Sequence, residues 1–504
     1  MTQTQFLIML IAIIPLLNAL TIKICANSQK AIDVFSKLFP VLYFVNLIGI
    51  YGNLDRDNSY LTIVESIRGV SLSFDIDEIS LKFLFGLNFI WLVFTFYSQR
   101  FFAIQQTKNV NGLNVFLVLI FAFINLIIIS KNLLTILFFY NCLIILSHFF
   151  SLRFLHKSET KISNIFTFLL YLESILFFFA IVATFKFVGQ IDFMDGGIFA
   201  DNLLSWQFGL LLCIYLSGLF LSIIFPFYLF YRNINLEPII LYALFFLSYA
   251  FVGLYILIKI LTLTFRLDII SGMLGKPFFM MIEIVFLLNI TLVSVFLLFS
   301  KGLKSSFFYL LFQQFGLAIF TTLFWAFFNP QKIQLTALSF ALSITLFFLA
   351  ISNIVLYLGK SENKELKGIF YKLKLSSVFL VVALLNMLGC FVGIGAVEKF
   401  FVIKTIINEK LLFSAAIYLV NFIAIIGFFV KMILPFFKRE KQEKPIQLKN
   451  KYAKLVVSAE ETKAVDEIAD EIDFDSAMIL GAFVVVIAII LSAALYPFFS
   501  QYFF

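Results

Sequence analysis

Long apolar runs follow one another along almost the whole chain, and no other feature limits its fold as strongly. A helix needs about 20 apolar residues to cross about 30 Å of hydrocarbon, because each residue advances the helix by about 1.5 Å. Runs of this kind occur near residues 4–24, 36–52, 78–98, 112–130, 132–152, 163–188, 206–231, 238–264, 276–300, 305–328, 333–358, 376–403, 411–437 and 476–500. The sequence therefore predicts an all-α, polytopic membrane protein with about 14 transmembrane helices.

Composition agrees with a membrane protein and excludes a nucleic-acid binder. Hydrophobic residues make up 62% of the 504-residue chain and charged residues 13%, whereas soluble proteins average about 25% charged residues. The net charge of +8 comes mostly from lysines and arginines in the loops, where such residues orient the spans. We therefore expect lipid and other membrane proteins as partners, and no nucleic acid.

No pattern in the sequence indicates a metal or a cofactor. The cysteines are scattered and show neither the spacing of a metal site nor that of a disulfide framework; they are Cys25, Cys142, Cys213 and Cys390. The chain also has no phosphate-binding glycine loop and no cysteine cluster for iron and sulfur. We expect no cofactor, no metal and no redox site.

Positive charge alternates along the loops and predicts the orientation of the chain. The odd-numbered loops hold about 24 of the 37 lysines and arginines, which places them in the cytoplasm and both termini outside. The first run has an uncharged start and no evident cleavage site, so we expect it to remain as the first span. Abundant Phe, Ile, Leu, Lys and Asn suit an AT-rich genome, and we expect a bacterial inner membrane or an organellar inner membrane.

The chain divides into a membrane domain at 1–437 with thirteen helices, a charged segment at 438–475 and a final transmembrane helix within 476–504. The charged segment begins basic and ends acidic. Apolar residues in its second half at Val465, Ile468, Ala469 and Ile472 have the spacing of an amphipathic helix. Two interpretations stay open for this segment, a cytoplasmic helix lying against a neighbour and a solvated tether.

A small β-hairpin is predicted between the second and third spans. Residues 60–64 and 70–74 are short extended runs, and Arg68-Gly69 lies between them as a turn. This hairpin would lie on the outer face of the membrane.

Several short motifs occur in an order that is typical of one family of membrane proteins. The longest is Leu303-Lys304 followed by Tyr309 and Gln314-Phe315-Gly316, which resembles the family's L-K-R-L-L-A-Y-S-S-x-x-[HQ]-x-G. The shorter ones are Phe74-Asp75-Ile76-Asp77-Glu78-Ile79-Ser80-Leu81, Tyr97-Ser98, Asn132-Leu133-Leu134, Pro226-Phe227, Glu237-Pro238, Gly253 with Tyr255, and Glu365-Leu366-Lys367-Gly368. Together they cover nearly the whole chain, which resembles the antiporter-like membrane subunits of respiratory complex I, the NADH:quinone oxidoreductase, and of Mrp-type cation/proton antiporters.

The resemblance implies broken helices near Pro226 and within Gly389–Gly395. Gly389, Gly395 and Lys399 match the family's G-x-P-P-x-x-G-F-x-x-K, although Phe391 and Val392 replace its two prolines and Ala396 its phenylalanine. Lys399 is therefore the one family position that keeps its ionisable group.

Other ionisable positions of the family carry apolar or neutral side chains in this chain. The resemblance implies a proton path of buried groups whose protonation responds to neighbouring charge. Its fifth-span glutamate falls on Asn141, its seventh-span lysine near Leu221, and its eleventh-span H-x-x-x-K near Phe340 and Ile344. The path of this chain is therefore expected to be weakened or lost.

Lys399 and its neighbours are the first candidates for an ion path. A charge at the centre of a membrane helix costs about 2.5–3.5 kcal/mol and usually persists where it lines a path, and glycines nearby can loosen the helix. Glu398 lies about 100° around the helix from Lys399, so we expect it to pair elsewhere. Gln314 can hold a water or simply pack against another helix.

Four further charges lie in or near the spans. Glu173 falls well inside the sixth span, where a role in ion movement and a role in helix packing stay equally open. Lys259, like Lys431, lies near a span end, where a long lysine commonly extends to the interface. Lys304 lies at a cytoplasmic span start, where orientation alone would place it.

Three functions stay open at this point. The favoured one is a membrane-arm subunit of a complex I-like or Mrp-like assembly, related to proton or cation translocators. The others are a structural subunit that contributes only packing, and a stand-alone secondary transporter. Membership of the NADH:quinone oxidoreductase would make the chain part of an enzyme without a redox site of its own.

Overall fold

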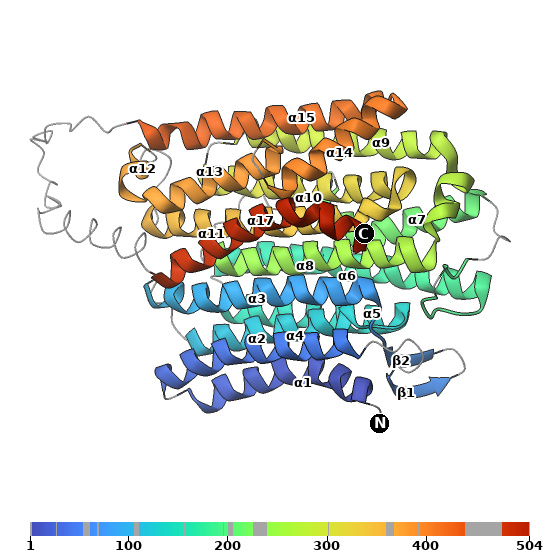
Figure 1. The fold of residues 1–504 in the computed structure, drawn as a ribbon, viewed down its shortest axis with the longest axis horizontal. Helices are drawn as coiled ribbons and strands as arrows, with labels where there is room; N and C mark the ends of the chain where they lie inside the picture. The colour runs from blue at the N-terminus through green and yellow to red at the C-terminus, as the bar shows by residue number, and fades with distance from the viewer. Residues whose placement is uncertain are drawn as a thin grey trace, which may run out of the picture.

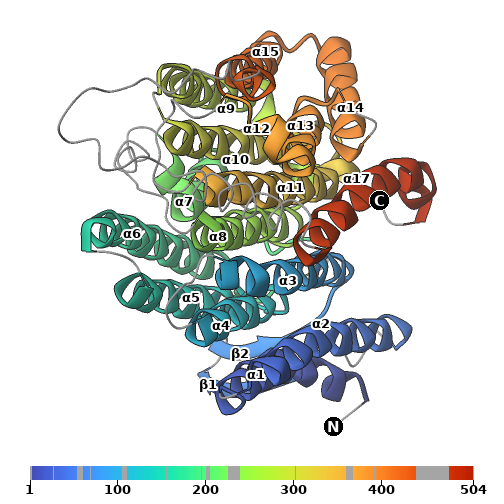
Figure 2. The ribbon, with the colours of Figure 1, turned by 90° about the vertical axis from the view of Figure 1, so that its left-hand side faces the viewer.

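The computed structural model describes residues 3–502, apart from 27, 54–60, 68–69, 105–109, 155–156, 195, 200–204, 225–238, 301, 359–366, 391–392 and 439–475. Long helices lie side by side with their axes nearly parallel (Figure 1). The chain passes through the bundle from one edge to the other, and its last helix then returns to the middle (Figure 2).

The described elements follow the predicted runs closely. They are α1 (Gln3–Ile24), α2 (Gln29–Gly52), β1 (Leu61–Ile67), β2 (Val70–Phe74), α3 (Glu78–Ile104), α4 (Val110–Ile128), α5 (Leu133–Phe154), α6 (Lys157–Val188), α7 (Ser205–Phe220), η1 (Leu221–Ile223), α8 (Ile239–Lys259), η3 (Ile260–Thr264), α9 (Leu267–Phe299), α10 (Leu303–Phe328), η4 (Pro330–Lys332), α11 (Ile333–Leu358), α12 (Ile369–Lys372), α13 (Lys374–Leu388), α14 (Ile394–Glu409), α15 (Leu412–Phe428), η6 (Phe429–Ile433), η7 (Leu434–Phe437) and α17 (Ser476–Tyr502). An α-helix satisfies its own backbone in hydrocarbon, where water is absent, so an apolar run becomes a helix.

The expectation of an all-α, polytopic membrane protein is confirmed. In the described part of the chain, eleven helical segments are long and apolar enough to cross a membrane. Three further apolar helices are shorter, at Leu133–Phe149, Tyr249–Thr264 and Lys374–Leu388. Each of the three overlaps a predicted run, and the total of fourteen stays a prediction.

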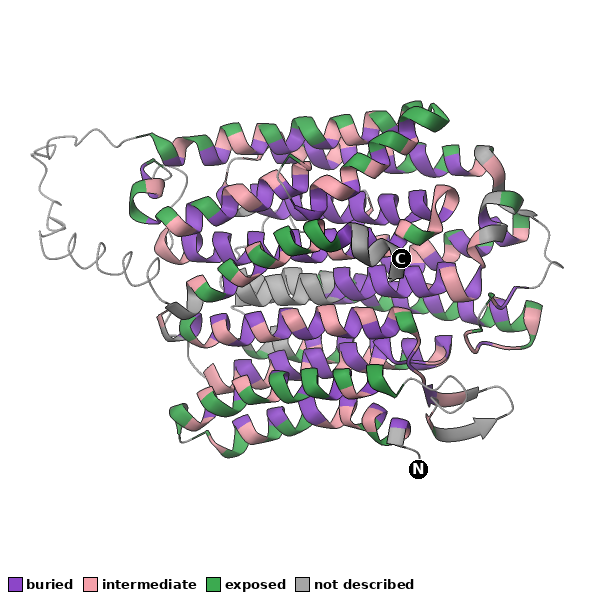
Figure 3. Ribbon diagram, viewed as in Figure 1, coloured by how far each residue is buried: buried purple, intermediate pink, exposed green. Residues whose placement is uncertain are grey.

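Helices α10 and α11 form the centre of the bundle. The apolar window of α10 is 100% buried and that of α11 is 83% buried, against 28% for the last helix; Figure 3 shows the same gradient from the centre to the rim. Hydroxyl groups on these two helices bond to their own backbone, as Thr321 does to Leu317 O at 2.7 Å and Ser343 to Ser339 O at 2.6 Å. Polar side chains can therefore lie at the centre without a partner from water.

Two predicted helix breaks have different outcomes. Helix α7 ends at Phe220 and continues as the 3-10 turn η1, while Pro226 and the rest of 225–238 lie outside the described residues. The second break is present, because α13 ends at Leu388 and α14 begins at Ile394. Gly389 ends α13 in the left-handed conformation, with φ of 77°, and its N–H donates to Asn386 O and Leu385 O. Glycine accepts this conformation without strain, so a break forms although both family prolines are replaced.

Strands β1 and β2 pair in antiparallel fashion where the hairpin is predicted, with Leu61 opposite Phe74 and Ile67 opposite Val70. The turn residues Arg68 and Gly69 lie outside the description. The charged segment at 438–475 also falls almost wholly outside it, so both interpretations of that segment remain predictions. Helix α17 packs against α3, α11 and α14, which brings the end of the chain back to the central helices.

We expect Gly395→Ala to destabilise the protein at the break. A Cβ at this position would lie 2.0 Å from Asn386 O, so the two helix ends would have to separate, at a cost of about 3 kcal/mol. The measurement is the thermal unfolding midpoint in detergent. Gly86→Ala is the matched control, because nothing lies within 4 Å of the new methyl group and alanine favours a helix. Equal midpoints for the two variants would contradict the packing described here.

Candidate functional site

Glu398 and Lys399 form an ion pair at the start of α14. The Lys399 Nζ lies 2.9 Å from Glu398 Oε2, and their side chains are 13% and 3% exposed. The expectation that Glu398 pairs elsewhere is therefore wrong. Both side chains are long enough to meet although the two residues are about 100° apart around the helix. In an apolar bundle, burying two paired charges costs less free energy than burying them separately.

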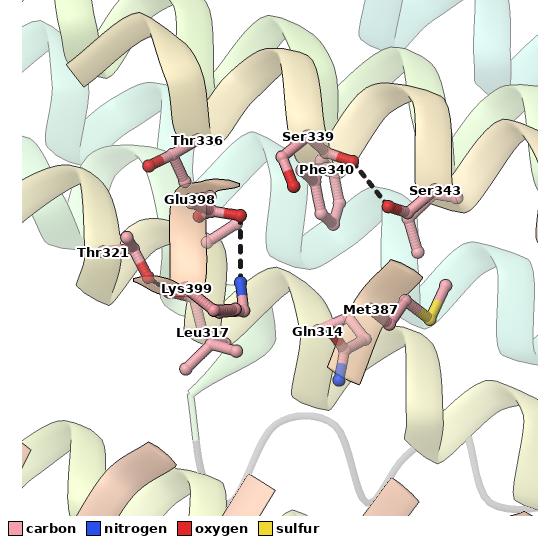
Figure 4. Close-up of a pocket in the computed structure, with 12 residues that line it drawn as sticks. Gln314, Leu317, Thr321, Thr336, Ser339, Phe340, Ser343, Met387, Glu398 and Lys399 are labelled. Carbon is pink, nitrogen blue, oxygen red and sulfur yellow. Dashed lines mark hydrogen bonds and ion pairs between the residues drawn. The ribbon is translucent and has the colours of Figure 1, made fainter. Parts of the chain in front are cut away.

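The pair borders a small cavity between α10, α11, α13 and α14 (Figure 4). Its volume is about 20 Å³, enough for about one water molecule. The cavity is lined by Gln314, Leu317, Ala318, Thr321, Thr336, Ser339, Phe340, Ser343, Ile344, Met387, Glu398 and Lys399. The Thr336 hydroxyl is buried and bonds to no protein atom, so this polar cavity suits an ordered water.

Five positions predicted from the sequence meet at this one cavity: Gln314, Phe340, Ile344, Glu398 and Lys399. Two of them, Phe340 and Ile344, are the positions where the resemblance implies a histidine and a lysine. Apolar side chains therefore fill the places in this cavity where the resemblance implies ionisable groups.

Glycine and amide groups hold the ion pair in position. A Cβ on Gly389 would lie 2.7 Å from Lys399 Cγ, so the glycine gives the lysine side chain its room. Asn386 links both sides of the break, because its Oδ1 accepts from Gly395 N at 3.1 Å and its Nδ2 donates to Ser343 Oγ at 2.7 Å. The Gln314 Nε2 donates to Asn421 Oδ1 at 2.8 Å, which ties α10 to α15.

Glu173 forms a second buried cluster, where α6 meets the end of α7. It is 1% exposed, and its Oε1 accepts from Ser222 N at 2.6 Å. Its Oε2 lies 3.4 Å from the Tyr140 hydroxyl. A cavity of about 20 Å³ adjoins the carboxylate, lined by Tyr140, Leu170, Glu173, Leu219, Ser222, Ile223, Tyr249, Ala250, Phe312 and Phe315.

The family positions Asn141 and Leu221 lie directly beside Glu173. The Asn141 Oδ1 accepts from Ser174 Oγ at 2.8 Å, and Leu221 precedes the Ser222 that bonds to the carboxylate. The acidic group therefore comes from α6, next to the site where the resemblance implies one on the fifth span.

Aromatic rings separate the two cavities. Phe315 lines the Glu173 cavity and stacks on Phe340, with centroids 5.7 Å apart and planes at 25°. Phe340 in turn lines the Glu398–Lys399 cavity, and Phe220 packs edge-on against Phe315 at 5.6 Å. In the described part of the chain, these apolar rings therefore lie between the two polar cavities.

Lys259 caps the end of another helix. Its Nζ lies 2.9 Å from Ser130 O and 3.4 Å from Ile128 O, just after α4 ends, and 3.5 Å from Asp77 Oδ2. The side chain is 2% exposed, so the expectation that it extends to the interface is wrong. The last carbonyl groups of a helix lack partners and carry negative partial charge, and this ammonium group supplies both donor and charge.

Lys431 does the same for α9 at the opposite end of the bundle. Its Nζ donates to Leu298 O at 2.7 Å and to Ser300 O, and it lies within the π-helical turn η6, as Lys259 directly precedes η3. Glu283 serves the first turn of α15, where its Oε1 accepts from the Ser414 N–H at 3.0 Å and from the Ser414 hydroxyl. Of the remaining candidates, Lys304 falls in the first turn of α10, and its side chain lies outside the description.

Several residues of these clusters were not predicted, notably Tyr140, Ser222, Asn386 and Asn421. Each is neutral and meets its partner across helices. A signal was available only for Asn386, an amide three residues before the first glycine of a predicted break.

Replacing Lys259 should destabilise the fold. Lys259→Met keeps the length of the side chain and removes the donor from the end of α4, at a cost of about 2–3 kcal/mol. Lys37→Met is the control, because the pair of Lys37 with Asp33 is 30% and 47% exposed and such pairs contribute less than about 1 kcal/mol. Thermal unfolding in detergent should show a clear loss for the first variant only; a similar loss for both would contradict the capping role.

Sequence comparison finds no relative, because no protein-family model and no curated protein matches the chain. Solved structures do share its fold. A chain of the Mrp complex from Dietzia sp. DQ12-45-1b has a TM-score of 0.76 at 14% identity, over 99% of this chain and 96% of that chain. A chain of respiratory complex I from Thermus thermophilus with bound NADH has a TM-score of 0.72 at 14% identity, over 97% of each.

A chain from an archaeal respiratory membrane complex, the membrane-bound sulfane sulfur reductase, has a TM-score of 0.71 at 14% identity, over 97% of this chain and 98% of that chain. The likeness extends over nearly the full length in all three cases. The expected resemblance is confirmed at the level of fold: this chain is folded like antiporter-like membrane subunits of respiratory and Mrp complexes.

Proposed function

We propose that this chain is a membrane-arm subunit of a complex I-like or Mrp-like assembly. The observation that supports it is the likeness over 97–99% of the chain to chains of multisubunit membrane complexes. The likeness also covers 96–98% of each of those chains, so this chain has about the same extent as they do. This suits a place among similar subunits. The partners would be other membrane subunits and lipid.

The ion path of this subunit is interrupted. The two cavities each hold about one water, and the Phe220–Phe315–Phe340 rings lie between them. Proton transfer along a chain of sites needs titratable or water-holding groups in succession, and aromatic rings are neither. The subunit keeps the site at Glu398 and Lys399 without a continuous route to it from Glu173.

The Glu398–Lys399 pair retains one chemical capability. The two charges of the pair neutralise each other, so burying them costs little free energy as long as both side chains stay in place. Displacement of Lys399 would leave the carboxylate of Glu398 alone beside the cavity. A neighbouring subunit that moved a charge near α14 would therefore change the free energy of the pair. The pair is suited to sensing charge movement in the assembly.

The membrane would be a bacterial inner membrane, with both termini outside. Basic residues at 367, 372, 374 and 438 cluster around α12 and η7, at one end of the bundle (Figure 1). The chain ends lie toward the other end, on the side of β1 and β2. This asymmetry supports a cytoplasmic position for the basic end. The segment 438–475 would connect the thirteen-helix domain to α17 on that side.

Gentle extraction from the native membrane should yield a large complex. Native electrophoresis followed by mass spectrometry of the band is expected to show this chain together with other subunits of the respiratory or Mrp kind. A lone species of 57.9 kDa would overturn the proposal and favour the stand-alone transporter.

Proton flux through vesicles tests the interruption. Vesicles that contain the purified chain should hold a pH gradient as well as empty ones, and Phe340→Asn should raise the flux at least several-fold, because an amide lets water join the two cavities.

Phe324→Asn is the control for this test. Phe324 is a buried phenylalanine of α10 that lines neither cavity, so the same chemical change should leave the flux low. A wild-type chain that already conducts protons, or equal flux through both variants, would contradict the interruption.

A further inference from the structure

Glu173 is a buried carboxyl group with no basic partner among the described residues of its cavity. The described residues that line this cavity include no lysine and no arginine, and the side chain is 1% exposed. An ionised carboxylate in such surroundings is very costly unless it is paired. The group therefore needs either a strong set of donors or a proton.

In the described part of the chain, the contacts of Glu173 come from Ser222, through its N–H and its hydroxyl, and from the Tyr140 hydroxyl. The Ser222 N–H reaches Oε1 at 2.6 Å, but the Tyr140 hydroxyl lies 3.4 Å from Oε2, which is long for an O–H donor. Oε1 is thus used as an acceptor, whereas Oε2 has room for a proton. A proton on Oε2 could be donated to the Tyr140 oxygen or to a water in the adjacent cavity.

Glu173 lies beside the place where α7 ends. Ser222 belongs to η1, directly after the last turn of α7, and its N–H is the backbone group that meets the carboxyl. Glu283 is a second buried glutamate, and it lies at the start of a helix. It is 3% exposed and accepts from Ser414 in the first turn of α15.

Close packing fixes this geometry. A Cβ on Gly218 would lie 2.7 Å from Phe177 N, so α6 and α7 approach each other closely one turn away from Glu173. The carboxyl group can therefore reach the backbone of η1, where α7 stops being an α-helix. The Ser222 hydrogen bond links the carboxyl group to the end of α7.

We propose that Glu173 is a proton-binding site coupled to the break in α7. Its protonatable neighbours in the cavity are Tyr140 from α5 and Tyr249 from α8, while α10 contributes Phe312 and Phe315 and the end of α7 contributes Leu219, Ser222 and Ile223. A metal cation would need several more oxygen ligands than this site offers. Because the rings close one side of the cavity, the proton exchanges locally and does not pass to Lys399.

This inference rests on the proposed function, because a proton that alters the end of α7 has a use where neighbouring subunits move protons. Its test uses the purified full-length chain alone. Failure of the test would leave the composition of the assembly unaffected, and a lone chain in the native gel would leave the proton site unaffected.

Infrared difference spectroscopy of the purified chain can observe the proton directly. A protonated carboxyl group gives a carbonyl stretching band that shifts in D₂O and disappears when the group ionises. We expect one such band that is lost at high pH, disappears in Glu173→Gln and remains in Glu283→Gln. The glutamine at 173 can still accept from Ser222 N–H, which favours correct folding.

Three results would overturn the proposal: the band is absent at every pH, it is present but does not titrate, or it survives in Glu173→Gln. If that variant fails to fold, Tyr140→Phe provides the assignment. It leaves the carboxyl group in place and removes the hydroxyl beside Oε2, so the frequency of the band should shift. An unchanged frequency would assign the band to another carboxyl group and reject the site.

Discussion

Inside hydrocarbon, every polar group must find its partner within the chain, and the arrangement of this bundle follows from that condition. Helix ends are the places where backbone groups lack partners. Three of the described charges serve such ends: Lys259 serves the end of α4, Lys431 the end of α9 and Glu283 the start of α15. Charge and helix end satisfy each other, so each group reduces the cost of burying the other.

The same condition explains where the helices can break. Leaving an α-helix frees backbone groups, and a break inside a membrane is tolerated only where other groups bond to them. Asn386 does this between α13 and α14, where its side chain accepts from Gly395 and donates to Ser343. Glu173 does it at the end of α7, where it accepts from Ser222. The two candidate clusters of this protein accordingly lie at the break between α13 and α14 and at the end of α7.

The helices could be predicted from the sequence because an apolar run long enough to cross a bilayer has few alternatives to an α-helix. The partners of buried polar groups could not. Glu173 accepts a hydrogen bond from Ser222, which lies 49 residues later in the chain. The spacing of residues along one helix does not reveal such a contact, so the sequence left open whether Glu173 serves transport or packing. For Lys259, a position near a span end suggested exposure, but the loop after α4 covers it. The pairing of Glu398 with Lys399 was not predicted, because the prediction considered only the angle between the two residues around the helix. Both side chains are long enough to meet across that angle.

The resemblance located the cavity correctly because four of the residues that it singled out, Gln314, Phe340, Ile344 and Lys399, line one space. What differs is the chemistry at these positions. Phe340 is large enough to stack on Phe315, so replacing a polar side chain by phenylalanine both removes a proton carrier and fills the space that water would need. The fold tolerates this change because the packing of α10 against α11 improves with an aromatic contact. In the function that we propose, packing and ion conduction therefore compete for the same volume between these two helices, and packing has taken it.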